Sequence, residues 1–208
     1  MMVEVKFIFD FGSPNAYLSR KAIPGIEERT GASFEYVPAL LGGIFKLTGN
    51  QAPSTAFAGI KNKLEYDQLE TARFVARHSL TQYRFNPHFP INTLQLMRGA
   101  VAAQTAGVFT RYMDEICADM WERGRRMDDP DVFRAALEEA GLPAEDLLSL
   151  IQMPEVKARL LANTEAAVAQ GAFGIPTFFV GKEMFFGKDR LRDVEEEIIA
   201  QRERGVAT

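Results

Sequence analysis

The feature that most constrains the fold is the order in which two hydrophobic periodicities follow each other along the chain. Segments rich in β-branched and aromatic residues occur near the start, at residues 3–9 and 33–39, and again near the end, at 177–180 and 183–186. Between about residues 55 and 170, apolar residues recur at helical spacing instead. A doubly wound sheet is excluded, because its strands and helices would alternate throughout the chain.

The first 40 residues predict a βαβ unit. A strand over residues 3–9 leads into Ser13 and Pro14, where serine can cap a helix and proline suits the first helical turn. The helix is expected over 14–29 and a second strand over 33–39. Strands joined by a helix in this way should lie parallel to each other.

The middle of the chain predicts five or six helices, and the end returns to strand. Residues 177–180 and 183–186 are typical of a hairpin, and a last helix is expected over 190–203. The order β-α-β, helices, β-β-α predicts an α/β, thioredoxin-like fold with a large all-helical insertion. We assign residues 1–50 and 171–208 to the thioredoxin-like domain and residues 51–170 to the helical insertion domain.

Composition narrows the classes of function. The 208 residues include 24 basic and 28 acidic side chains, and the net charge of −4 argues against a nucleic-acid or anionic-membrane partner. The chain shows no secretory signal pattern and no apolar run near the roughly 20 residues of a membrane span, so we expect a soluble, cytoplasmic protein. His78 and His88 lack partners at ligand spacing, which predicts no metal site.

The one cysteine of the chain is Cys117. A single cysteine excludes an intramolecular disulfide and the dithiol chemistry of a C-x-x-C motif. Cys117 lies on an apolar helical stripe, and this position predicts a buried side chain that acts as a small hydrophobe.

The first motif with chemical potential is the predicted helix start at Ser13. A helix N-terminus carries unpaired backbone N–H groups and a partial positive charge, so it stabilises an anion. A hydroxyl is a poor nucleophile without an adjacent base, but it can donate a hydrogen bond to a thiolate that a ligand brings in. A plain Ser-Pro helix cap is the alternative interpretation.

The second motif is the Gly174–Thr177 segment that leads into the predicted hairpin. Its Ile175-Pro176 step predicts a cis-proline turn, which would present the Ile175 backbone N–H and C=O to an extended ligand. An ordinary turn before a strand is the alternative. In a thioredoxin-like fold this segment and the Ser13 helix start would converge.

Three stretches carry a resemblance to a known family: FDFGSPNAYL, FGIPTFFVG and MFFGKDRL. They resemble the DsbA-like family, and within it the branch that contains 2-hydroxychromene-2-carboxylate isomerase and kappa-class glutathione transferase. The resemblance covers both ends of the chain closely and the helical middle loosely. It implies glutathione as the cofactor, a small aromatic hydroxy-acid as the substrate, a place in aromatic catabolism, and a homodimer.

The resemblance also implies roles for particular residues. It makes Ser13 the catalytic residue, which faces the glutathione sulfur. The implied glutathione-binding set is Ser13, Lys46, Ile175, Pro176, Gly187, Lys188 and Asp189, and the implied substrate-binding set is Lys46, Asn86 and Pro87. The chain departs from the family pattern at residues 85–90, where FNPHFP replaces an F-N-S-R-R-like stretch, and at Phe185-Phe186, where tryptophans are often found.

The function implied is a glutathione-dependent isomerase of the 2-hydroxychromene-2-carboxylate isomerase type. The glutathione thiolate, stabilised at Ser13, would add to the substrate and leave again. Two alternatives stay open: a kappa-type glutathione transferase or peroxidase that consumes glutathione at the same site, and a thioredoxin-fold binding module without chemistry.

Overall fold

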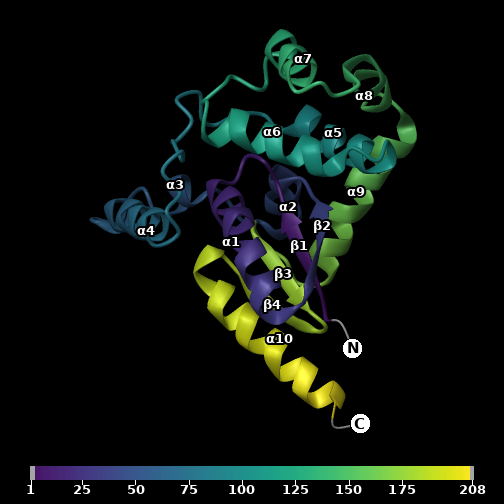
Figure 1. The fold of residues 1–208 in the computed structure, drawn as a ribbon. Coiled ribbons are helices and arrows are strands. Elements are labelled where there is room, and N and C mark those ends of the chain that lie inside the picture. Colours follow the sequence, from purple (N-terminus) through teal and green to yellow (C-terminus); the bar gives the residue numbers. More distant parts are fainter. Residues whose placement is uncertain (1–2, 207–208) are drawn as a thin grey trace.

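A four-stranded mixed sheet forms the centre of the computed structural model, which describes residues 3–206 (Figure 1). The strands lie in the order β2-β1-β3-β4. Strand β1 (Glu4–Phe9) pairs in parallel with β2 (Ser33–Pro38) and antiparallel with β3 (Thr177–Val180), which forms a hairpin with β4 (Glu183–Phe186). The predicted βαβ unit and the predicted hairpin are both confirmed.

The helix that follows β1 begins where the sequence predicts and ends one residue later. Helix α1 (Pro14–Thr30) has Ser13 as its N-cap, and the Ser13 Oγ accepts a hydrogen bond from the Ala16 N–H at 3.2 Å. It ends at Gly31, whose φ of 66° lies in the left-handed region that favours glycine. After the hairpin, a short 3₁₀ turn η1 (Lys188–Arg190) leads into α10 (Leu191–Val206), which packs beside α1 (Figure 1).

Seven helices lie between residues 51 and 170, all of which the structure describes, rather than the five or six predicted. The difference comes from a short element, since α3 has only four residues. An eighth helix, α2, precedes them and was not predicted. The bounds are α2 (Leu41–Thr48), α3 (Pro53–Ala56), α4 (Lys63–Arg77), α5 (Leu94–Thr105), α6 (Phe109–Trp121), α7 (Pro130–Glu139), α8 (Ala144–Leu150) and α9 (Pro154–Ala169).

The hydrophobic core is continuous from the sheet into the helical region. Phe7 of β1 stacks on Phe178 of β3 with a ring-centroid distance of 5.1 Å, while Trp121 and Tyr112 of α6 are fully buried. Helix α9 packs back against β2 and α2, so the last helix of the middle region also covers the sheet. The division at residues 51 and 170 therefore stays a prediction. Across residues 3–206, every helix is too short or too polar to cross a membrane.

Candidate functional site

The turn between β1 and α1 fixes the position of Ser13. The Ser13 N–H donates to the Asp10 carbonyl at 3.0 Å, and the Gly12 N–H donates to the Asp10 carboxylate at 2.8 Å. Ser13 is only 4 % exposed. Its hydroxyl donates to the Ile175 carbonyl at 3.1 Å, although the two residues lie 162 positions apart in the sequence. The structure therefore brings the two predicted motifs together.

The Ile175-Pro176 peptide bond is cis, as the sequence predicts. The Ile175 carbonyl is not free, because the Ser13 hydroxyl occupies it. Within residues 3–206, the backbone N–H groups of Ile175 and Asn15 both lack an acceptor. Asn15 lies in the first turn of α1, where the helix leaves such groups unpaired. Two backbone donors and one hydroxyl thus flank the start of α1.

The Gly187–Asp189 turn adjoins the cis-proline segment. The Gly187 N–H donates to the Pro176 carbonyl at 2.9 Å, and the φ of Gly187 is 97°, a value that side chains other than hydrogen rarely allow. Lys188 is 4 % exposed, and its Nζ lies 2.6 Å from the Asp189 carboxylate and 5.3 Å from the centre of the Phe74 ring of α4. The Asp189 side chain is otherwise open to solvent.

Helix α2 carries Lys46, which is exposed. The N-terminal end of this helix is held by the Leu41 N–H, which donates to the Asp10 carboxylate at 2.8 Å. Just beyond its C-terminal end, the Asn50 amide donates to the Phe173 carbonyl at 2.7 Å, two residues before Ile175. Helix α2 is therefore tied to the Ser13 turn at one end and to the approach to the cis-proline at the other.

Asn86, for which the sequence predicts a substrate contact, lies buried in a network of backbone hydrogen bonds. Asn86 is 1 % exposed, and its Nδ2 donates to the carbonyls of Met120 and Arg125, each at 2.9 Å. Its Oδ1 accepts from the His88 N–H at 2.9 Å. These bonds occupy both ends of the amide. Pro87, in contrast, is exposed, so only this member of the predicted pair is open to a ligand.

Burial governs the ionisable groups near the turn. Burial raises the pKa of Asp10, and the N–H groups of Leu41 and Gly12 oppose that shift by favouring the charged carboxylate. Burial also raises the pKa of Cys117 to about 12, which makes its thiol a poor nucleophile at neutral pH. In the part of the chain that the structure describes, no three His, Cys, Asp or Glu residues gather as a metal site would require.

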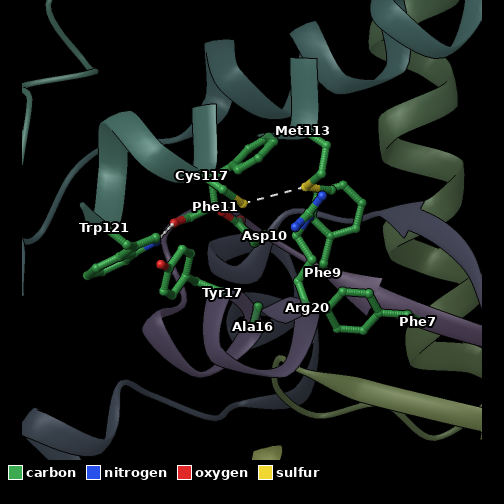
Figure 2. Close-up of a pocket in the computed structure, with 10 residues that line it drawn as sticks. All are labelled: Phe7, Phe9, Asp10, Phe11, Ala16, Tyr17, Arg20, Met113, Cys117 and Trp121. Atoms are coloured by element: carbon green, nitrogen blue, oxygen red, sulfur yellow. Dashed lines mark hydrogen bonds between the residues drawn. The ribbon is translucent and has the colours of Figure 1, made fainter. Parts of the chain in front are cut away.

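Two residues that support the turn carried no assigned role in the sequence analysis. Figure 2 shows Trp121 at the edge of a small pocket between α6 and the β1–α1 segment, with its indole nitrogen bonded to the Phe11 carbonyl at 2.8 Å. Cys117 lies on the wall of the same pocket and is buried, as predicted. Asp10 is the second such residue. Its D-x-G spacing is typical of an Asx turn and could have indicated its role, whereas the Trp121 contact spans 110 positions and has no local signal.

Fold and site together define a class: thioredoxin-fold proteins in which a serine at the start of the first helix faces a cis-proline loop. The chain belongs to the DSBA-like thioredoxin domain family, whose model matches residues 4–199.

Among proteins of known function, the chain is 27 % identical to 2-hydroxychromene-2-carboxylate isomerase of Sphingobium xenophagum, over 96 % of this chain and 100 % of that protein. It is 29 % identical to glutathione S-transferase kappa 1 of Rattus norvegicus, over 90 % of this chain and 87 % of the relative.

Solved structures support the same fold. A 2-hydroxychromene-2-carboxylate isomerase structure superposes with a TM-score of 0.83 at 22 % identity, covering 98 % of both chains. Pseudomonas aeruginosa DsbA superposes with a TM-score of 0.61 at 16 % identity, covering 100 % of this chain and 87 % of DsbA. At these identities the likeness concerns the fold alone.

Proposed function

We propose that the protein is a glutathione-dependent isomerase of the 2-hydroxychromene-2-carboxylate isomerase type, with Ser13 as its catalytic residue. The observation that carries this proposal is the contact between the Ser13 hydroxyl and the Ile175 carbonyl at the cis-proline loop. The proposal is supported by a relative of that name that aligns along nearly the whole chain.

The residues present suit a small acidic tripeptide. The unpaired N–H of Ile175 can pair with a peptide carbonyl, as an added strand would. The Asp189 carboxylate can accept from an α-ammonium group, and the exposed Lys46 can meet a carboxylate. Around Gly187, the position that a Cβ would occupy is open, with no atom within 4 Å, so a ligand can approach its backbone closely.

Glutathione, when bound, supplies a thiolate that can add to an electrophilic carbon and leave again. The contribution of the chain is to favour that charge. The Ser13 hydroxyl must turn from the Ile175 carbonyl in order to donate to an anion, and the unpaired Asn15 N–H adds a second donor at the positive end of α1. We assign Pro176, Gly187 and Lys188 to shaping this groove, and Pro87 to the substrate side.

A second candidate is a kappa-type glutathione transferase, favoured by the 29 % identity to the rat kappa 1 enzyme. Both candidates need the same stabilised thiolate, so the site does not distinguish them. The fate of glutathione during the reaction does. An isomerase leaves the amount of glutathione constant during turnover, whereas a transferase consumes one molecule for each product. A cytoplasmic homodimer that acts on an aromatic hydroxy-acid completes the proposal.

The test is calorimetric titration of the protein with glutathione, followed by a glutathione balance during turnover. Asp189→Ala should weaken binding by about 1.5–3 kcal/mol, the range for hydrogen bonds to charged groups. Glu183→Gln, which removes an exposed carboxylate of β4, serves as the control and should bind as the wild type does. Absence of binding by the wild type at millimolar glutathione would favour the non-catalytic binding module.

A further inference from the structure

We propose that Asp10 is a positioning residue that fixes the Ser13 turn and helix α2 relative to each other. The inference rests on the proposed function, because the Ser13 turn and α2 carry two of the proposed glutathione contacts, Ser13 and Lys46. Asp10 itself is buried beneath the turn and is 1 % exposed. It acts through the groups that it holds.

The first set of Asp10 hydrogen bonds shapes the turn between β1 and α1. The Asp10 carboxylate accepts from the Gly12 N–H at 2.8 Å, which closes an Asx turn, while the Asp10 carbonyl accepts from the Ser13 N–H at 3.0 Å. The side chain of Thr93, which precedes α5, also favours the charged form of this carboxylate and so opposes the rise in its pKa. A Cβ added to Gly12 would lie 3.1 Å from the Thr93 methyl carbon, so the turn is also confined from outside.

The second carboxylate oxygen of Asp10 caps helix α2. The residue at the N-cap position of α2 is Leu40, whose side chain cannot accept a hydrogen bond. The Leu41 N–H donates instead to the second carboxylate oxygen of Asp10 at 2.8 Å. A carboxylate has two acceptor oxygens and can serve Gly12 and Leu41 at once, whereas an asparagine side chain has only one oxygen for the two donors.

Residue Thr164 supplies a matched control for this capping role. It is buried, and its Oγ1 accepts from the adjacent Leu40 N–H at 3.0 Å, so it supports the same end of α2 without contacting the Ser13 turn. Thr164→Val removes that acceptor and preserves the shape of the side chain. Comparing Thr164→Val with a variant of Asp10 therefore separates the loss of support for α2 alone from the loss of support for both α2 and Ser13.

The experiment is a double-mutant cycle between Asp10→Asn and Ser13→Ala, with turnover measured in the presence of glutathione and a chromene carboxylate. Asp10→Asn should lower kcat roughly tenfold in the wild type but less than about twofold in Ser13→Ala, because the hydroxyl that it positions is gone. Thr164→Val should have the same effect in both backgrounds. An equal loss from Asp10→Asn in both backgrounds would overturn the proposal and leave Asp10 a general structural residue.

A second measurement keeps the proposal testable if Asp10→Asn does not fold or if glutathione does not bind. Leu41→Pro removes the N–H that meets Asp10 together with the leucine side chain, and Leu41→Ala removes the side chain alone. Proline is well tolerated at the first position of a helix after an extended residue such as Leu40. Relative to Leu41→Ala, Leu41→Pro should speed hydrogen exchange of the Ser13 amide roughly tenfold or more. Unchanged Ser13 exchange would contradict the coupling, whereas failure of wild-type glutathione binding would contradict only the proposed function.

Discussion

Two turns of the molecule are each built on one buried Asx side chain, Asp10 after β1 and Asn86 in the segment between α4 and α5. Both residues are 1 % exposed, and both accept from a backbone N–H two positions later. They differ in their long-range partners. Asp10 accepts from the N–H that begins α2, whereas Asn86 donates to two carbonyls near the end of α6.

This difference shows why similar local sequences have different consequences. The turn at Asp10 needs an acceptor at both side-chain oxygens, and a negative charge suits that arrangement. The turn at Asn86 needs a donor on one side and an acceptor on the other, so a neutral amide is required. The first turn presents Ser13, while the second closes the loop that carries Phe85 and Phe89 over Trp121.

The largest expected effect comes from Asn86→Asp. This change would place a buried carboxylate against the carbonyl oxygens of Met120 and Arg125. We expect a loss of about 3–5 kcal/mol in the free energy of unfolding, the cost of a buried charge without a partner. Chemical denaturation measures it. Asn92→Asp is the control, because Asn92 also accepts from a backbone N–H two positions later but is exposed. A loss below about 1 kcal/mol for Asn86→Asp would remove the distinction between the two turns.

Ser13→Ala tests whether the chemistry belongs to the first turn. We expect kcat to fall roughly 10- to 1000-fold, equivalent to about 1.4–4 kcal/mol of transition-state stabilisation, with glutathione affinity within several-fold of the wild type. Ser19→Ala is the control, since it removes another buried hydroxyl of α1 that bonds only within the helix. Equal rates for Ser13→Ala and the wild type would exclude Ser13 from the mechanism.

Trp121 joins the two turns, so its substitution should affect both. Its indole donates to the Phe11 carbonyl, and its own carbonyl accepts from the Arg84 N–H at 2.7 Å. Trp121→Phe leaves the buried Phe11 carbonyl without a donor and should lower the free energy of unfolding by about 1–3 kcal/mol. It should also lower turnover. Tyr112→Phe loses a comparable buried bond, to the Leu96 carbonyl, within the helical region. It should lose stability but keep its turnover; a matching loss of turnover would refute the link.

The smallest effect is expected at Cys117, which lines the same pocket as Trp121. Because burial raises the pKa of its thiol to about 12, the folded protein should resist alkylation at pH 8, and resistance should weaken only as the pH approaches that value. Cys117→Ala should keep turnover within about twofold. Rapid alkylation of the folded wild type at pH 8 would bring a protein thiol back into consideration.

The strands, α1 and the hairpin could be predicted because their signals are local: alternation, a Ser-Pro start and a glycine stop. Helix α2 was missed because Gly42 and Gly43 lower its helix propensity, and its cap comes from Asp10, 31 positions away. At the site, the proximity of Ser13 and Ile175 could be predicted, because a thioredoxin-like fold brings the two motifs together. The sequence gave no sign of the Asn86 hydrogen bonds, because the Met120 and Arg125 carbonyls that its amide meets lie 34 and 39 positions further along the chain.

The most direct measurement is a crystal structure of the protein soaked with glutathione. We expect the sulfur within hydrogen-bonding reach of the Ser13 Oγ, about 3–4 Å, with the hydroxyl turned away from the Ile175 carbonyl and with the peptide paired to the Ile175 N–H. The γ-glutamyl end should reach Asp189. Glutathione bound elsewhere, or a Ser13 hydroxyl that still donates to Ile175 while the sulfur points away, would contradict the proposal that this turn stabilises the thiolate.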